Sequence, residues 1–361
     1  MRVDRLALQD FRNIHAAELI PEGELTVICG DNGQGKTNLL EAVWLLTGGK
    51  SFRGSKDVEL IRRGEEFAVL EAATQDSRRT HELRITIGGP GSQRPGRTAR
   101  LNGVDKGRAS ALAGAFTAVV FDPGHLSLVK GSPAGRRRFL DSALCQLYPG
   151  YLAALRRYTR LVTQKNALLK HYDRTPGAGE MLDVFDEELV RVGEELIGRR
   201  KEYLERLFPL LSRNYEEISS GREALTSEYQ PSSGEVPLAE AVRRSRGADL
   251  RAGFCTVGPQ RDDIEFQLDG QSAKAFASQG QQRSIALSLK LAEASAAEDV
   301  TGEHPVMLLD DVLSELDASR QEYLLNRIGG GQTFVTACDP AAFERTSGQV
   351  FRMENGVLSP W

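Results

Sequence analysis

The sequence predicts an α/β protein whose two strand-rich ends form one core, with a helical segment inserted between them. Three observations lead to this prediction. A buried strand, a glycine-rich loop and a helix follow one another over residues 24–47. A second apolar run at residues 304–311 ends in two aspartates. Between these segments lies a helical insertion of about 130 residues, and its stretch 180–219 has the 3-4 spacing of apolar positions that is typical of an amphipathic helix.

Length and composition set the outer limits. The chain has 361 residues and a formal net charge of −4, and its acid excess lies in the last third. Its N-terminal stretch carries charges among the apolar residues, and no apolar run approaches the ~20 residues of a membrane helix. We therefore expect a soluble, cytoplasmic protein with no membrane partner. The cysteines lack the spacing of a metal site, so we expect reduced thiols at Cys29, Cys145, Cys255 and Cys338.

The N-terminal elements come first along the chain. Alternating or clustered apolar residues predict strands at residues 2–9, 24–30, 67–74, 81–88, 98–104 and 116–121, and a helix at 36–47. From Ser132-Pro133, a typical helix start, the chain is expected to be helical to about Tyr172, with a break near Pro149-Gly150.

The apolar positions of residues 180–219 then describe one long helix, in which Pro209 is a candidate kink. Strand character is expected again over 251–270, followed by a helix over 278–297 and strands over 304–311 and 331–337. We therefore divide the chain into a core of residues 1–122 and 256–361 and a helical insertion of residues 123–255.

The clearest motif lies at residues 30–37, which read GDNGQGKT and match the phosphate-loop pattern G-x-x-x-x-G-K-[ST] in full. Its glycines let backbone N–H groups turn toward phosphate oxygens, and the helix that follows adds the positive end of its dipole. Lys36 is expected to reach the β- and γ-phosphates of ATP, and Thr37 to offer its hydroxyl to Mg²⁺. The predicted ATP-binding residues of this loop are Gly30, Asp31, Asn32, Gly33, Gln34, Gly35, Lys36 and Thr37.

The sequence VMLLDD, residues 306–311, predicts the partner of this loop. Four apolar residues bring Asp310 to the metal at the edge of the sheet, and Asp311 follows where it could polarise an attacking water. Acidic residues after buried strands often merely cap loops, so the pattern is informative only together with the phosphate loop. Together they predict Lys36, Asp310 and Asp311 as catalytic residues, and Thr37 and Asp310 as metal ligands.

A third motif, ASQGQQRS at residues 277–284, opens the helix expected from residue 278. Ser278 and Gly280 form a second helix start suited to an anion. Since one ATP has one γ-phosphate, already held by the chain's own loop, we expect Ser278 to act in trans on the ATP of a second copy. Such a site is complete only in a head-to-tail dimer with two-fold symmetry. The alternative is an ordinary serine N-cap.

The order of these motifs resembles the ABC-type ATPase heads of chromosome and repair proteins. Six segments together resemble the RecF family of bacterial recombination mediators: LALQDFRN, GKSFRGSKDVELIRRG, FDPGHLSLVKGSPAGRRRFLD, GPQRDDIEF, SQGQQRS and LLDDVLSELD. This resemblance implies an α/β ABC-type ATPase head, with a P-loop core and a mixed or antiparallel β-subdomain, interrupted by an α-helical arm.

The resemblance also implies an ATP-dependent homodimer that binds double-stranded DNA and single-strand/double-strand junctions. It would work with RecR and RecO and help to load RecA onto gapped DNA. The predicted ATP-binding set further includes Arg12, Asn13, Asn38, Ser278, Gly280 and Gln281. The broader ABC pattern has Glu where this chain has Asp311, and a His where Ala337–Cys338 falls, so we expect a weak, DNA-stimulated ATPase.

Two basic stretches, residues 50–63 and 78–108, are candidates for DNA contact because phosphate binding needs clustered positive charge and no base-reading pattern. The alternative is a solvated face. The predicted contacts are Lys50, Arg53, Lys56, Arg94, Arg97 and Arg100. For GRRRF, residues 135–139, DNA contact and plain solvation stay equally open.

Other functions built on the same loop fit less well. A nucleotide kinase leaves SQGQQ unexplained, and a transporter's ATP-binding subunit does not account for the long insertion. A structural SMC-type linker needs coiled coils far longer than this insertion. A different SMC-like DNA-repair ATPase or clamp, without a role in RecA loading, is the remaining alternative.

Overall fold

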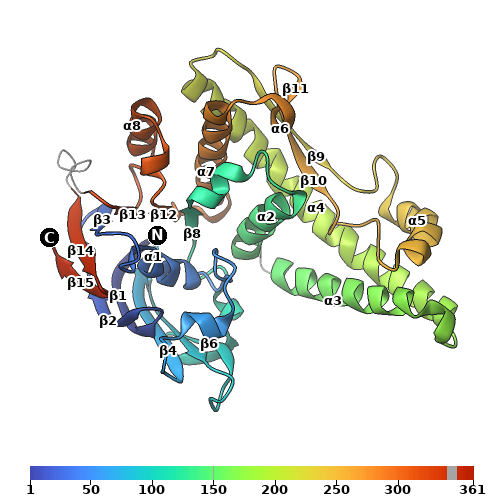
Figure 1. Ribbon diagram of the computed structural model, residues 1–361, viewed down its shortest axis with the longest axis horizontal. Helices are drawn as coiled ribbons and strands as arrows, with labels where there is room; N and C mark the ends of the chain where they lie inside the picture. Colours follow the sequence, from blue (N-terminus) through green and yellow to red (C-terminus); the bar gives the residue numbers. More distant parts are fainter. Residues whose placement is uncertain (149, 340–347) are drawn as a thin grey trace. The chain divides into compact units, whose positions relative to one another are not determined.

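The computed structural model describes residues 1–148, 150–339 and 348–361. The chain forms two compact units, one of residues 1–127 and 283–361 and one of residues 128–282 (Figure 1). Both boundaries lie later than those expected from the sequence, by five residues at the first and by 27 at the second. The shift arises because the strand at 263–268 pairs with the strand at 225–230, which joins residues 256–282 to the helical unit.

The first unit contains two six-stranded sheets. One is antiparallel throughout, in the order β2-β1-β4-β5-β6-β7. Its strands are β1 (Arg2–Phe11), β2 (Ile14–Leu19), β4 (Phe67–Gln75), β5 (Thr80–Gly88), β6 (Gly96–Leu101) and β7 (Val104–Arg108).

The other sheet is mixed, in the order β15-β14-β3-β13-β12-β8. Among its described strands, only β15 pairs antiparallel to its neighbour. The strands are β3 (Leu25–Cys29), β8 (Ala118–Phe121), β12 (Val306–Asp310), β13 (Thr333–Ala337), β14 (Gln349–Glu354) and β15 (Val357–Pro360). Helix α1 (Lys36–Leu45) contacts strands of both sheets, and the buried cluster around it includes Leu40, Leu70 and Leu308. Burying this apolar surface is the main force that joins the two sheets.

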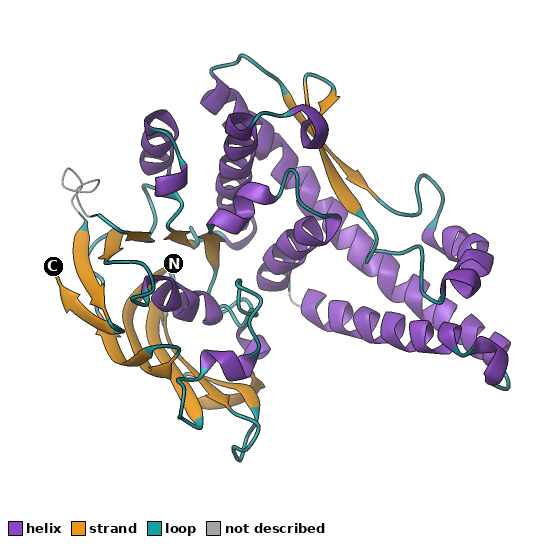
Figure 2. Cartoon of the chain, viewed as in Figure 1, coloured by secondary structure: helices purple, strands orange, loops and turns teal. Residues whose placement is uncertain are grey.

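The second unit is mostly helical (Figure 2). Its helices are α2 (Pro133–Leu147), α3 (Tyr151–Lys170), α4 (Ala178–Ser219), α5 (Leu238–Ala252) and α6 (Ala273–Phe276). The small antiparallel sheet β11-β10-β9 contains β9 (Leu225–Gln230), β10 (Asp263–Leu268) and β11 (Gln271–Ser272). Helix α7 (Gln279–Thr301) begins in this unit and continues into the first, which also holds α8 (Ala318–Arg327).

Most predicted elements are present, and the differences have local causes. The strand expected over 98–104 is a hairpin, because Asn102 and Gly103 adopt φ values of 51° and 76° and form a two-residue turn between β6 and β7. The strand character expected over 251–270 was wrong for its first part, where α5 continues to Ala252. Helix α4 continues through Pro209. The expected break near Pro149-Gly150 separates α2 from α3, with Pro149 outside the described residues. The sequence did not predict β2, β9, β14, β15, α5 or α8.

No helix among the described residues is long and apolar enough to cross a membrane. The helical unit contains a buried group of charged side chains. Lys165 of α3 is 2% exposed, and its Nζ lies 2.6 Å from Oδ1 of Asp186 and 3.0 Å from Oδ2 of Asp249. The second carboxylate oxygen of Asp249 accepts hydrogen bonds from the N–H and the hydroxyl of Thr256. This ion triad joins α3, α4 and α5.

Replacing Asp249 by alanine should therefore destabilise the arm. The change leaves the buried Lys165 ammonium with one carboxylate instead of two and removes the acceptor of Thr256, so we expect a loss of about 3 kcal/mol in the free energy of unfolding. Urea titration measures this loss. Asp183→Ala is the matched control, since Asp183 is 66% exposed and pairs with Arg246 at the surface of the same arm. Equal losses in the two variants would contradict the role given to the triad.

Candidate nucleotide-binding site

The phosphate loop connects β3 to α1 in the first unit. Gly30, Gly33 and Gly35 adopt φ values of 150°, 81° and 118°, which residues with a Cβ rarely adopt. A Cβ at Gly35 would lie 2.8 Å from Oδ1 of Asn13. A Cβ at Gly30 would collide with the carbonyl oxygen of Met353. The glycines are therefore needed both for the turn and for close packing around it.

Lys36 occupies the centre of this loop and is 7% exposed. Its ammonium donates hydrogen bonds to the carbonyl oxygens of Gly30 and Asp31, the latter at 3.1 Å. The Sγ atom of Cys338, just after β13, lies 3.6 Å from the same nitrogen. Phosphate oxygens that enter the loop would compete with these neutral acceptors for the Lys36 donor.

The structure brings together Thr37 and Asp310, the two predicted metal ligands. The hydroxyl of Thr37 donates to Oδ1 of Asp310 at 2.8 Å, and the hydroxyl of Thr336 donates to the same oxygen at 3.0 Å. Asp310 ends β12 and is paired with Thr336 of the parallel strand β13. Hydroxyl and carboxylate oxygens are the ligands that Mg²⁺ prefers, so this pair fits the predicted metal.

Burial raises the pKa of the Asp310 carboxyl above its ordinary value of 3.8; the carboxylates of Asp122 and Asp311 also raise it, while the hydroxyls of Thr37 and Thr336 oppose them. A raised pKa means that the ionised carboxylate is less stable in the folded protein than in the unfolded chain. The cost is present at neutral pH and disappears as the pH falls through the folded pKa.

Asp310→Asn should consequently raise the melting temperature of the nucleotide-free protein at neutral pH, while it weakens Mg²⁺-dependent nucleotide binding. The gain in melting temperature should shrink as the pH falls through the raised pKa of Asp310, because the native carboxyl then protonates. Thermal denaturation without Mg²⁺, over a series of pH values from neutral to acidic, measures it. A lower melting temperature at neutral pH would show that hydrogen bonds to the ionised carboxylate outweigh its burial.

Asp311, the predicted water-polarising residue, has a φ of 51°. Its N–H donates to the hydroxyl of Thr336 at 2.8 Å, and its carbonyl oxygen accepts from Ser314. A non-glycine residue in this conformation is uncommon and costs energy, and such strain concentrates at functional sites. The sharp turn after β12 therefore falls at the predicted water-polarising residue.

Asn13 contacts the phosphate loop, whereas Arg12 contacts the helix that follows it. The Asn13 amide donates to the carbonyl oxygen of Gln34 at 2.9 Å and accepts from Asn38 at 2.8 Å, so it braces the loop. Arg12 makes a two-pronged ion pair with Glu41, whose side chain is fully buried. Arg53 donates to Asn38 at 2.9 Å. Predicted ATP-binding residues and the predicted DNA-binding residue Arg53 line the same pocket. The residues that line it are Arg12, Asn13, Asn38, Arg53, Glu59, Ile61, Arg62 and Arg63.

Ser278, Gly280 and Gln281 belong to the second unit. The Ser278 hydroxyl oxygen accepts the N–H of Gln281 at 3.3 Å, and the Gln281 side chain accepts the N–H of Ser278 at 2.6 Å. This reciprocal arrangement is a capping box. Ser278 thus has the N-cap geometry weighed as an alternative above, and it is also exposed.

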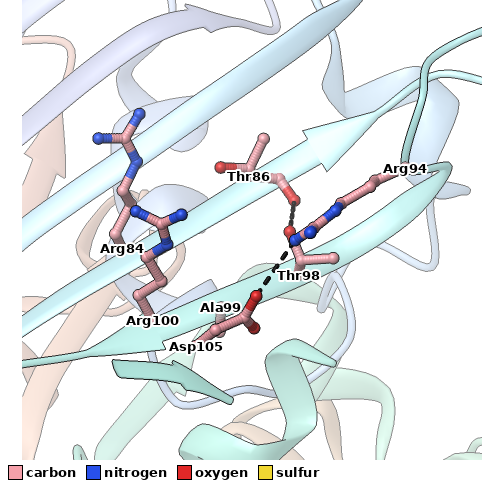
Figure 3. Close-up of a pocket in the computed structure, with 7 residues that line it drawn as sticks. All are labelled: Arg84, Thr86, Arg94, Thr98, Ala99, Arg100 and Asp105. Carbon is pink, nitrogen blue, oxygen red and sulfur yellow. Dashed lines mark hydrogen bonds and ion pairs between the residues drawn. The ribbon is translucent and has the colours of Figure 1, made fainter. Parts of the chain in front are cut away.

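The side chains of the predicted DNA-binding residues differ in their exposure to solvent and in their ion pairs. Lys50 and Lys56 are exposed. Arg94 and Arg100 line a pocket on the antiparallel sheet together with Arg84, Thr86, Thr98, Ala99 and Asp105 (Figure 3). Arg97 differs, because it is 13% exposed, lies 2.9 Å from Asp57 and donates to the carbonyl oxygen of Gly49. Arg84, which lies in the predicted 78–108 stretch but not among the six predicted contacts, lines the same pocket.

Comparisons with known proteins identify the family of this chain. The family model described as RecF/RecN/SMC N terminal domain matches residues 2–357. A protein of Lactobacillus delbrueckii subsp. bulgaricus, the DNA replication and repair protein RecF, is 39% identical over an alignment that covers 99% of each chain. The chain belongs to the RecF family.

Solved structures extend the agreement to the fold. The recombination mediator protein RecF with ATPγS, in the RecFOR pathway, has a TM-score of 0.91 at 32% identity and covers 99% of this chain and 98% of that one. A structure of an SMC head bound to the C-winged helix domain of ScpA has a TM-score of 0.57 at 16% identity, covers 99% and 96% of the two chains, and shows the fold alone. The predicted fold class, an ABC-type ATPase head with a helical arm, is confirmed.

Two of the three arginines of GRRRF are used inside the arm unit, whereas Arg138 is exposed and both alternatives stay open for it. Arg136 is 3% exposed, pairs with Asp263 at 2.7 Å and donates to the carbonyl oxygens of Leu128 and Gly131. Arg137 donates to the carbonyl oxygen of Asp262 at 2.7 Å. These residues fasten the GPQRDD segment to α2 inside the arm unit.

Asp122 is a further residue that sequence reasoning missed. It follows Phe121 of β8, which is paired with Leu309 of β12, so Asp122 and Asp310 end neighbouring parallel strands. Burial tends to raise the pKa of Asp122, but the His125 ring, the Gly124 N–H and the charge of Lys290 together hold it below its ordinary value. The signal was available, since a second acidic residue follows a second buried strand.

Proposed function

We propose that this chain is an ATP-dependent, DNA-binding recombination mediator that acts in gap repair in the cytoplasm. ATP with Mg²⁺ would bring two copies together head to tail on double-stranded DNA or at a junction with single-stranded DNA. The dimer would help RecR and RecO to load RecA onto the gap. The observation that supports this most directly is the 2.8 Å contact between Thr37 and Asp310 beside a complete phosphate loop.

In the proposed mechanism, Lys36 turns from the carbonyl oxygens of Gly30 and Asp31 to the β- and γ-phosphates. Thr37 and Asp310 would hold Mg²⁺, which supplies positive charge to the transferring phosphoryl group. Asp311 would orient a water and accept its proton while the water oxygen bonds to the γ-phosphorus and the bond from that phosphorus to ADP breaks. We expect slow hydrolysis of ATP to ADP and phosphate, stimulated by DNA.

The second half of each site would come from the partner copy. Ser278 uses its hydroxyl oxygen as the acceptor of the helix cap, which leaves its O–H proton without an acceptor among the described residues. An exposed donor at a helix start suits a γ-phosphate. Both the helix cap and the trans contact can therefore be made by the same hydroxyl.

DNA would bind the antiparallel sheet. Arg84 and Arg100 face each other on β5 and β6 as directly paired residues, an arrangement in which like charges repel. Arg84 is balanced by Glu71 at 2.7 Å and Arg94 by Asp105 at 3.1 Å, whereas Arg100 has no ion pair among the described residues. A DNA phosphate between these guanidinium groups would relieve the repulsion.

Replacing Arg84, Arg94 and Arg100 by alanine should weaken duplex binding about equally for different sequences. For each DNA phosphate that the variant no longer neutralises, the slope of log affinity against log salt should fall by about 0.9. Fluorescence anisotropy at several salt concentrations gives this slope. Arg5→Ala is the control, because Arg5 is 48% exposed on the same sheet and pairs with Glu18 much as Arg94 pairs with Asp105. An unchanged slope in the triple variant would make this surface a solvated face.

The proposed function as a whole is tested by the mass of the protein in solution, with and without Mg²⁺-ATP and with and without duplex DNA. We expect a dimer that needs ATP and is stabilised by DNA. An assay of RecA filament formation on gapped DNA, with RecR and RecO present, then separates a mediator from a repair ATPase or clamp of another kind. No stimulation of filament formation would exclude the mediator role and leave the ATPase intact.

A further inference from the structure

Both polar atoms of the Gln281 side chain make hydrogen bonds inside their own unit. Its Oε1 accepts the N–H of Ser278 at 2.6 Å, and its Nε2 donates to Oε1 of Glu223 at 2.6 Å. With the 3.3 Å bond from its N–H to the Ser278 hydroxyl, Gln281 holds the helix start through three hydrogen bonds. Moving this side chain toward a nucleotide would break at least one of the bonds that hold this turn.

Glu223 extends this arrangement into the arm. Its second carboxylate oxygen accepts the hydroxyl of Tyr215 at 2.6 Å, and Tyr215 is 1% exposed near the end of α4. Glu223 follows α4 in the chain and so lies between a buried anchor and the start of α7. A carboxylate that accepts two hydrogen bonds is held more firmly than a neutral acceptor.

The next glutamine supports the same turn from a different side. Gln282 is 8% exposed, and its side-chain amide donates to the carbonyl oxygen of Ala277 at 2.6 Å. Gln281 and Gln282, the last two glutamines of SQGQQ, therefore bond to the N–H and the C=O of the peptide between Ala277 and Ser278. The backbone of the turn is fixed, and the Ser278 hydroxyl is fixed with it.

We infer that Glu223 is a positioning residue for the trans-acting helix start, and that it acts through Gln281, which is a strut for Ser278 rather than a ligand of ATP. The inference rests on the proposed function. It assigns a task to a residue outside all three nucleotide motifs. It also predicts that the hydrogen bond between positions 223 and 281 matters, whereas the chemical identity of either residue alone does not.

The test is a swap of the two side chains. Gln281→Glu keeps the capping box, because a carboxylate also accepts the Ser278 N–H, but it places two carboxylates against each other. We expect its dimer dissociation constant in Mg²⁺-ATP to rise about ten- to a hundredfold. Adding Glu223→Gln restores a donor at position 223 toward an acceptor at 281, and the introduced amide can still accept from Tyr215. The double variant should return to within about threefold of the native value.

Analytical ultracentrifugation measures dimerisation, and binding of a fluorescent ATP analogue to the monomer reports on the chain's own phosphate loop. That binding should stay unchanged in all variants, since the loop lies in the other unit. A double variant as weak as Gln281→Glu would overturn the inference and return Gln281 to the ATP ligands. Failure of the native protein to dimerise in Mg²⁺-ATP would instead overturn the proposed function.

Glu223→Ala covers the case in which Gln281→Glu does not fold. It removes both hydrogen bonds of the carboxylate, so we expect dimerisation to weaken about tenfold. Glu228→Ala, at an exposed position of β9 in the same unit, is the matched control and should dimerise normally. A folded Glu223→Ala protein that dimerises as tightly as this control would also overturn the inference.

Discussion

Lys36→Met abolishes ATP binding and, with it, ATP-dependent dimerisation: this is the largest single effect that we expect. Lys36 is the one cation in the GDNGQGKT sequence of the phosphate loop, and its ammonium already lies at the loop centre, bonded to the Gly30 and Asp31 carbonyl oxygens. Methionine has a similar length and no charge, so the loop can keep its shape while the phosphates lose their charged donor. Affinity should fall about a hundredfold or more.

Titration with a fluorescent ATP analogue measures the loss, and the mass in solution shows whether a dimer still forms. Lys50→Met is the control, because Lys50 is exposed in the same unit and its backbone carbonyl, not its side chain, accepts the Trp44 indole N–H. If Lys36→Met still dimerises on addition of ATP, the phosphate loop is not the site that controls assembly.

Mixing two inactive variants should restore hydrolysis, which is the second large effect. Ser278→Arg blocks the helix start of α7 and leaves that chain's phosphate loop sound, whereas Lys36→Met does the reverse. Each homodimer then has two damaged sites. In a mixed dimer, one site carries both defects, and the other combines the sound Lys36 of one chain with the sound Ser278 of the other.

The mixture should therefore reach up to about half of the native ATPase rate per dimer, if the two sites act independently. The measurement is phosphate release with duplex DNA present, for each variant alone and for the mixture. Ser278 is exposed, so arginine can be accommodated without unfolding the chain. The trans hypothesis would not survive a Ser278→Arg protein that hydrolyses ATP normally, at a rate per molecule independent of concentration.

The sequence predicted the parts of this site that depend on contiguous residues. The phosphate loop, the two aspartates at the end of β12 and the turn before α7 each depend on a few neighbouring residues. Their backbone geometry is set by local glycines, apolar runs and helix starts, which can be read from the sequence. The strand predicted over residues 251–262 is not formed. Helix α5 ends at Ala252, and the segment after it makes contacts with side chains, such as the hydrogen bond from Arg137 to the carbonyl oxygen of Asp262. Periodicity carries no signal for such a segment.

What only the tertiary structure decided is which side chains meet. Thr37 and Asp310 are 273 residues apart in the chain, and their contact depends on the register of β12 against β13 and on the placement of α1. The same holds for charge: Arg97 and Arg136 look like their exposed neighbours in sequence, yet each is held in an ion pair with an aspartate and largely withdrawn from solvent. A run of basic residues predicts positive charge but not its partners, because a long side chain pairs with whatever the fold brings near. The sequence by itself therefore determined the motifs from which a nucleotide site is predicted. The packing of the sheets and helices determined which side chains meet and which charged side chains stay exposed to a ligand.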